Sequence, residues 1–206
     1  MQRIHFPCRK PPAPGHQEGM ALLVVLLLLV VVMILGLSSS QIALLSERSA
    51  RGDRDYQIAW QSAEAALVDA QFDIEGPGTA QRAAVFAPNN LLDFIDGCGA
   101  ASEPVRRGLC LPSAIGKPVW LTVDLADLHA PVTQFGDFTQ RAFDAGSAGL
   151  KPAYKPRYII EAVPDTQLFS DKSIGADKRF VYRVTALGFG PRDTVQAVVQ
   201  MIFRKD

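Results

Sequence analysis

The chain has 206 residues, about the size of one domain, and carries 21 Lys and Arg against 21 Asp and Glu. This balanced charge gives no electrostatic reason to expect nucleic acid or an acidic surface as the main partner. The apolar residues are concentrated near the N-terminus, and the remainder of the chain has the composition of an ordinary soluble domain.

The first 19 residues form a basic leader that contains four prolines. Its cations Arg3, Arg9 and Lys10 outnumber the single acid, Glu18. Positive charge before an apolar segment predicts that this end stays in the cytoplasm while the C-terminal part crosses the membrane. Proline prevents an early helix start, and we exclude residues 1–19 from the fold.

An uncharged apolar run extends from Met20 to Leu37, and the next charged residue is Glu47. The run is at the lower end of what spans a hydrocarbon core of about 30 Å, and uncharged residues after it add length. We therefore expect one transmembrane helix in the inner membrane, with the C-terminal domain in the periplasm. A secretory signal peptide is the alternative, because Ser38-Ser39-Ser40 could supply a cleavage site. The run is, however, longer than such signals usually are.

A helical pattern continues beyond the apolar run as far as Glu75. Charged residues, Asp55 and Asp69 among them, fall mainly elsewhere on the helical wheel, and the mixed charges from Glu47 to Asp55 predict a solvated face. Gly76-Pro77-Gly78 ends the helix. This pattern predicts a helix over 20–75, of which 20–37 is transmembrane, followed by a globular domain over 76–206. The apolar and small residues recur at steps of mostly three or four positions, at Ile42, Leu45, Tyr56, Ala59, Ala63, Ala66, Ala70 and Ile74.

Short strand-like runs follow in the second half of the chain. The last two are joined by a six-residue, turn-rich link, which suggests an antiparallel hairpin. An antiparallel sheet with one apolar face needs a cover, and the amphipathic half of the helix can supply it. The sequence thus predicts an α+β fold in which a long N-terminal helix packs on an antiparallel β-sheet. The predicted strands are Val119–Val123, Arg157–Val163, Phe180–Leu187 and Thr194–Phe203.

Four stretches give the chain a resemblance to the type IV pilin-like superfamily, and most of all to the PilX group of minor pilins. The leader ends in Gly before the apolar run, the helix contains an Ala-Glu-Ala-Ala segment, two cysteines flank a loop, and a Tyr-Arg-Val-Thr-Ala strand lies near the C-terminus. The stretches are Gln17–Leu22, Ala59–Leu67, Cys98 with Gly108–Cys110, and Tyr182–Gly190.

The resemblance implies a role in assembling a type IV pilus by association of helices, in a priming or tip complex. It implies that prepilin peptidase cuts after Gly19 and that the new N-terminal residue, Met20, is N-methylated. Other minor pilins, the major pilin and a PilY-family tip adhesin are the implied partners, and adhesion and twitching motility are the implied processes. The residues expected to form the helix-packing surface are Leu22, Val24, Leu26, Leu29 and Met33.

Val24 departs from the pattern of major pilins, which carry Glu at this fifth position of the mature chain. In that family the carboxylate is thought to pair with the terminal amine of the neighbouring subunit. Because a charge in lipid is costly unless it is paired, the carboxylate draws an incoming subunit into register. Its absence leads to the hypothesis that this chain occupies a first position, at the tip or in an initiating complex.

Cys98 and Cys110 remain as an even pair once Cys8 is lost with the leader. In an oxidising compartment a disulfide is the leading interpretation, and two free thiols are the alternative. The only histidine after the leader is His129, which argues against a metal site at these cysteines.

No catalytic or cofactor-binding motif is present, and we expect neither an enzyme nor a metal site. Asp124, Asp127, His129 and Asp137 could form a cluster, but scattered loop acids are more often solvated. Two other functions remain open. One is a pseudopilin of a type II secretion system, and the other is a single-pass sensor or binding protein that retains its leader.

Overall fold

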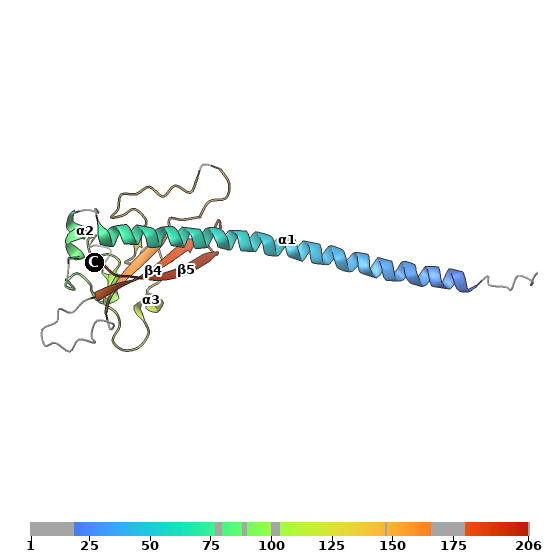
Figure 1. The fold of residues 1–206 in the computed structure, drawn as a ribbon, viewed down its shortest axis with the longest axis horizontal. Helices are drawn as coiled ribbons and strands as arrows, with labels where there is room; N and C mark the ends of the chain where they lie inside the picture. The colour runs from blue at the N-terminus through green and yellow to red at the C-terminus, as the bar shows by residue number, and fades with distance from the viewer. Residues whose placement is uncertain are drawn as a thin grey trace, which may run out of the picture. The chain divides into compact units, whose positions relative to one another are not determined.

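The computed structural model describes residues 19–76, 80–87, 90–99, 104–146, 148–165 and 180–205. Most of the predicted leader and the predicted Pro77-Gly78 helix stop lie outside these residues. The chain forms two compact units, residues 1–50 and residues 51–206, and the long helix α1 (Met20–Glu75) contributes to both (Figure 1).

Helix α1 has the limits that the sequence predicts. It ends where Gly76 takes a positive φ of 76° and donates its N–H to the carbonyl of Phe72 at 3.0 Å. Glycine adopts this left-handed conformation without steric cost, which makes it a common end of helices. In the first unit the described side chains of α1 are exposed from end to end.

In the second unit, α1 buries one stripe of small residues. This confirms the predicted face, except that Tyr56 is 48% exposed. The predicted solvated position of Asp55 is wrong, and so is the prediction that Asp69 lies away from the buried face, because both side chains are buried. They lie on the inner face of α1 and are bonded to partners from distant segments. The fully buried members of the stripe are Ala59, Ala63, Ala66, Ala70 and Ile74.

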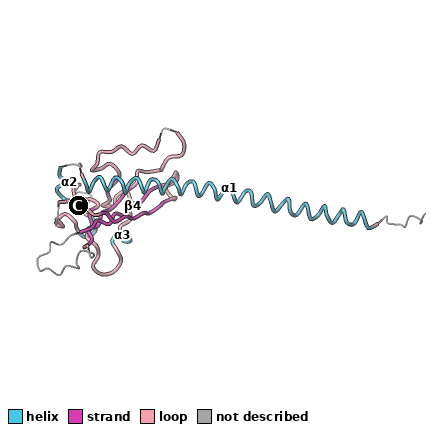
Figure 2. The backbone as a smooth tube through the Cα atoms, in the orientation of Figure 1, coloured by secondary structure: helices cyan, strands magenta, loops and turns pink. Residues whose placement is uncertain are grey.

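The second unit contains one five-stranded sheet (Figure 2). The order is β1-β3-β4-β5, and β2 also pairs with β3. Pairings β2–β3, β3–β4 and β4–β5 are antiparallel, which confirms the predicted hairpin, and β1 pairs with β3 in parallel. The strands are β1 (Leu109–Cys110), β2 (Thr133–Gln134), β3 (Arg157–Pro164), β4 (Phe180–Phe189) and β5 (Gln196–Phe203).

Three short helical segments complete the described elements: α2 (Ala80–Val85), the 3₁₀ turn η1 (Asp96–Cys98) and α3 (Val119–Thr122). The strand predicted over Val119–Val123 is wrong, because these residues form α3. The Val123 N–H and the Thr122 hydroxyl both donate to the carbonyl of Val119, at 3.0 and 2.9 Å. Burial of Val119 in the core holds this turn, and tertiary packing overrides the strand propensity of valine.

A core packs on each face of the sheet, although Val198 and Ile202 of β5 stay exposed. On the helix side the core combines the alanine stripe with aromatic residues, among them Tyr158 and Tyr182. On the opposite side, loop residues between Cys98 and Val132 pack on Ile159, Leu187 and Phe189. The sequence predicts only the helix as a cover, so this second core is an addition to the predicted architecture.

Candidate assembly surfaces

The apolar half of α1 offers a continuous surface for association. Every side chain from Met20 to Leu37 is exposed, although no charged residue occurs among them. Burying one such Val or Leu side chain is worth about 1.5–3 kcal/mol, so a helix of this kind requires lipid or other helices around it. The residues predicted to form the helix-packing surface are 52–74% exposed; they are Leu22, Val24, Leu26, Leu29 and Met33.

These five residues do not share one face. At 3.6 residues per turn, Leu22, Leu26, Leu29 and Met33 follow each other at steps of four, three and four and line one side of α1. Val24 lies on the other side of the helix. A neighbouring helix packed along Leu22, Leu26, Leu29 and Met33 would therefore leave Val24 free to face another subunit or lipid.

The predicted cleavage position lies at the boundary of α1. Gly19 forms the turn before the helix, and Met20 is the first helical residue and is 72% exposed. A Cβ placed on Gly19 would meet no atom within 4 Å, so packing does not require glycine here. Cleavage after Gly19 and methylation of Met20 stay predictions.

Within the described part of the chain, α1 is the one helix long and apolar enough to cross a membrane, by length and composition. Its position near the N-terminus is also that of a signal sequence, which passes the same test. The helix is consistent with a pilin-type membrane anchor.

Within the second unit, α1 and the sheet approach each other closely. A Cβ on Gly188 of β4 would overlap the backbone of Ala59 and Ala63, so only glycine fits this position. Gly190 is nearly as close, with the carbonyl of Asp55 2.8 Å from its Cβ position. Small residues on both elements bring the helix axis close to the sheet.

Asp73 and Arg82 form a buried ion pair at the C-terminal end of α1. Arg82 Nε lies 3.1 Å from both carboxylate oxygens of Asp73, and its Nη2 lies 3.0 Å from Oδ2. The Tyr158 hydroxyl donates to the same Oδ2 at 3.3 Å, and Arg82 Nη1 donates to the carbonyl of Val105. This cluster ties α1 to α2, to β3 and to the loop before β1.

Burial shifts the pKa of two members of this cluster. The loss of hydration raises the pKa of the Asp73 carboxyl, and Arg82 opposes that rise. Burial, and to a lesser degree the charge of Asp73, raises the pKa of the Tyr158 hydroxyl well above 10. Tyr158 therefore remains a hydrogen-bond donor far into the alkaline range.

Asp69, one helical turn before Asp73, holds a second loop. Its carboxylate accepts the Gly136 N–H at 2.8 Å and the Thr139 hydroxyl at 2.5 Å, and Arg141 Nη1 lies 3.6 Å away. The Arg141 guanidinium also lies 4.6 Å from the ring centre of Phe72. Asp69 therefore fixes the 136–141 loop against the side of α1.

Two further ion pairs brace the sheet. Arg183 of β4 binds the buried Glu161 of β3 through two hydrogen bonds of 2.9 and 2.7 Å, and these bonds raise the pKa of Arg183. Arg192 in the β4–β5 turn lies 3.2 Å from the carboxylate of Asp55 on α1. Periodicity could not identify these pairs, because nothing local in the sequence indicates which distant residues meet.

Cys98 and Cys110 form a disulfide, and both side chains are fully buried in the second core. The bond joins η1 to β1, where Ile95 and Cys110 also form a parallel bridge. The disulfide therefore fixes the loop that covers the face of the sheet opposite α1.

The loop acids near His129 do not converge on a metal site. The Asp124 and Asp127 carboxylates accept the backbone N–H groups of Ala126 and His129, both at 2.9 Å. Asp137 binds Arg107 and lines, with His129, an open pocket of about 330 Å³. Among the described residues, no group of three His, Cys, Asp or Glu side chains could hold a metal ion.

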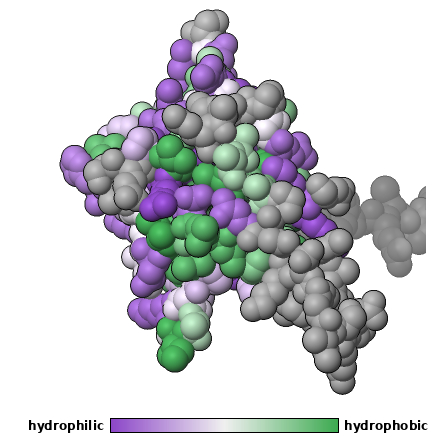
Figure 3. Space-filling view, turned by 90° about the vertical axis from the view of Figure 1, so that its left-hand side faces the viewer, coloured by the Kyte–Doolittle hydropathy of each residue, from purple (hydrophilic) through white to green (hydrophobic). Residues whose placement is uncertain are grey.

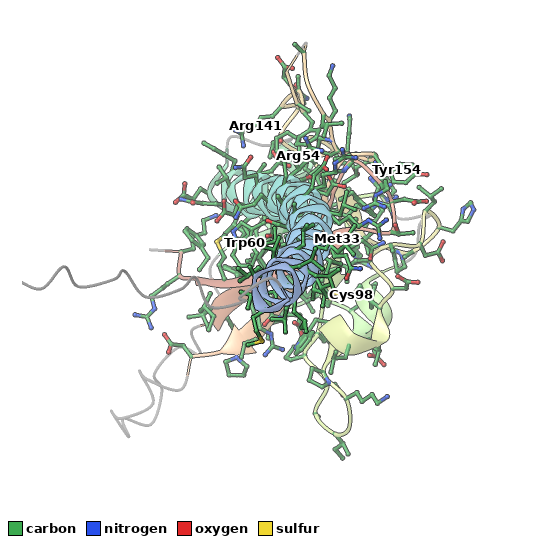
Figure 4. The ribbon with its side chains drawn as sticks, turned by 90° about the vertical axis from the view of Figure 1, so that its right-hand side faces the viewer. Met33, Arg54, Trp60, Cys98, Arg141 and Tyr154 are labelled. Carbon is green, nitrogen blue, oxygen red and sulfur yellow. A yellow bond between two sulfur atoms is a disulfide. The ribbon has the colours of Figure 1, made fainter. Side chains whose placement is uncertain are left out.

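Apolar side chains are also exposed on the folded unit. Figure 3 shows them among hydrophilic ones on the face turned to the viewer. The exposed members of the second unit include Trp60 on α1 and Val198 and Ile202 on β5. In Figure 4, Trp60 and Tyr154 lie on opposite sides of α1. These exposed residues give the second unit apolar contact sites of its own, in addition to the apolar half of α1.

Two family profiles match the chain. Residues 18–68 match the PilX N-terminal family, and residues 46–205 match the C-terminal part of type IV pilus assembly protein PilX. No curated protein and no solved structure matches. The two matches together cover the described chain from the start of α1 to the end of β5. The chain therefore belongs to the PilX family, whose members are minor pilins that take part in the assembly of type IV pili.

Proposed function

We propose that this minor pilin primes assembly of the pilus or occupies its tip, through association of the apolar half of α1 with the helices of other pilins. One observation carries the proposal: an uncharged, fully exposed helical segment is continuous with a helix that forms the core of a folded unit. Such a segment is stable only in lipid or among other apolar helices.

The proposed topology is a single pass through the inner membrane, with the leader in the cytoplasm and the folded unit in the periplasm. The basic leader supports this orientation, and the Cys98–Cys110 disulfide fits an oxidising compartment. Prepilin peptidase would remove residues 1–19, and Met20 would become the methylated N-terminus. The chain would then leave the membrane as part of the pilus.

Val24 supports the first position in the filament. Without a carboxylate here the chain has no charge in the apolar half of α1 that could draw it beneath an existing subunit. A subunit that is placed first has no such need. The specific partners that we propose are other minor pilins, the major pilin above or below them, and a PilY-family tip adhesin.

The mature N-terminus is the first test. Mass spectrometry of the protein from a strain with active prepilin peptidase should give an N-methylated Met20. A start near Gln41 would instead indicate signal-peptide cleavage, and an intact Met1 would indicate a sensor or binding protein that keeps its leader. The same strain without prepilin peptidase is the control and should contain the uncleaved chain.

The second test is piliation. Deleting the gene should reduce the number of surface pili, and expression of the unchanged chain should restore them. Normal piliation after deletion would contradict the priming role. Normal piliation together with a loss of protein secretion would identify a secretion pseudopilin.

A further inference from the structure

The outer edge of β5 has no partner strand among the described residues. In the order β1-β3-β4-β5 the strand pairs on one side with β4 over all eight of its residues, and within the described chain no strand pairs with its other side. The opposite end of the sheet differs, because β1 and β2 there are two residues long each. β5 is thus the long edge of this sheet.

The backbone groups that face this edge follow from the hydrogen bonds to β4. Gly190 donates its N–H to the carbonyl of Val195, and bonded and non-bonded pairs then alternate along the two antiparallel strands. The residues of β5 that bond to β4 are Ala197, Val199, Met201 and Phe203. The residues whose N–H and C=O groups point outward are Gln196, Val198, Gln200 and Ile202.

This edge lacks the features that usually protect an exposed strand. No charged residue and no proline occurs from Thr194 to Phe203, and charges return only at Asp193 and Arg204 on either side. Soluble proteins normally place lysine, proline or a bulge on a long edge because such edges pair with other chains. An edge of this length without such features is a template on which a strand of another chain can pair.

Apolar side chains lie beside the edge on the face of the sheet away from α1. Val198 is 53% exposed and Ile202 is 73% exposed, and the pleat puts both on this face. Every second side chain of a strand added next to β5 would lie on this face and cover Val198 and Ile202.

The face of the sheet toward α1 is also apolar beside the edge. Met201 and Phe203 are half-buried here and pack in the same core as Leu67 of α1. Trp60, seven residues before Leu67, lies on the same side of the helix and is 38% exposed. Its indole N–H is bonded to Glu64 at 2.8 Å, which leaves the ring to make apolar contacts.

We propose that β5 accepts a strand from another protein of the same pilus, added to the sheet at its free edge. The added segment is uncharged over the length of β5, because a charge brought to this edge would lose its hydration without finding an ion-pair partner. It is apolar on both faces, because its side chains contact Val198 and Ile202 on one face and Trp60 and Phe203 on the other. The identity of the partner as a pilus component rests on the proposed function.

Hydrogen exchange tests this strand addition. The intact chain in lipid nanodiscs is compared with the same chain co-expressed and purified with the other pilins of its own pilus, with residue-level mass spectrometry as the readout. The amides of the four outward-facing residues should exchange at least tenfold more slowly in the assembly. Equal rates in the two samples would overturn the proposal.

Two pairs of variants separate strand addition from a loss of folding. Val198→Pro removes an outward N–H but no bond to β4, so the amides of Met201 and Phe203 should stay slow while the protection of Gln200 and Ile202 is lost. Val198→Lys should weaken co-purification at least tenfold. Ile115→Lys, at a side chain that is 93% exposed and outside β5, should leave co-purification within twofold of the unchanged chain.

The remaining outcomes are also decisive. Protection of β5 in the chain alone that fades on dilution would identify a second copy as the occupant and overturn the proposal. An unprotected β5 in a protein whose deletion abolishes pili would overturn strand addition and leave the priming role. A protected β5 with normal piliation after deletion would support strand addition and contradict the priming role.

Discussion

Arg82 binds both carboxylate oxygens of Asp73 from nine residues further along the chain, and neither side chain has any exposed surface. The pair joins the end of α1 to the loops that follow it. Removing one partner of such a pair is far more damaging than removing both, because the remaining charge stays buried.

We therefore expect Arg82→Met to lower the free energy of unfolding by about 3–5 kcal/mol, the range for breaking a buried ion pair. The double variant Asp73→Asn with Arg82→Met should recover part of that loss. Denaturant titration of the intact chain in detergent measures both. Arg106→Met is the matched control, because Arg106 is 40% exposed beside Asp93 and its pair should be worth less than about 1 kcal/mol.

Gly188→Ala should separate helix from sheet. The added methyl group overlaps the backbone of Ala59 and Ala63, which cannot move without shifting α1, and overpacking of this kind costs about 1–3 kcal/mol or more. Thermal unfolding followed by circular dichroism should show the loss. The control is Gly52→Ala, whose Cβ meets nothing within 4 Å and which should be neutral or stabilising.

Tyr158 makes the folded state sensitive to alkaline pH. Its folded pKa lies above its unfolded value of 10.0, so the unfolded chain loses this proton first as the pH rises. Stability from this group is complete below pH 10 and declines above it. Tyr158→Phe should remove that part of the decline above pH 10. An unchanged slope in the variant would show that the hydroxyl is not held protonated by burial.

Reduction of the disulfide should loosen the loop cover over the second core. The closed loop spans 12 residues, and the chain-entropy model gives a loss of about 3 kcal/mol for a loop near this length. Unfolding with and without reductant, compared with the Cys98→Ala and Cys110→Ala double variant, measures it. If reductant also lowered the stability of the double variant, the effect would not come from the Cys98–Cys110 disulfide.

Val24→Glu should change where the chain enters the filament. The new carboxylate supplies the group that major pilins are thought to use in docking beneath a neighbour, and an unpaired charge in lipid favours such docking. Immunogold labelling should then find the variant along the shaft, whereas the proposed function places the unchanged chain at the tip. Val24→Gln, which adds a similar bulk without charge, should keep the distribution of the unchanged chain.

The parts of the fold that the sequence predicted well are those set by local patterns. The limits of α1 followed from a run of apolar periodicity that ended at glycine, β4 and β5 followed from alternation within single strands, and β3 followed from the prolines on either side of it. Strand β1 escaped prediction because two residues carry no alternation. Val119–Val123 was misassigned because its valine is held by packing rather than by strand pairing.

The ion pairs illustrate a second limit. Asp69 and Asp73 lie one turn apart within the alanine stripe. This position is the one signal in the sequence that their side chains are buried. The arginines that pair with Asp73 and Asp69 lie 9 and 72 residues further along the chain, so only the folded structure identifies these pairs. The helix-packing residues, in contrast, could be proposed from sequence because they depend on α1 alone.

The carboxylates on the inner face of α1 also matter before the domain has folded. In the proposed topology, Asp69 and Asp73 leave the membrane ahead of Arg141 and Arg82, the arginines that later pair with them in the second unit. Bare carboxylates are costly in hydrocarbon, so the alanine-rich turns that carry them cannot lodge in the bilayer although alanine itself would be tolerated. The charges that finally close the fold thus first keep the alanine-rich turns out of the bilayer, whereas Glu47, the first charge after the apolar run, marks the end of the membrane anchor.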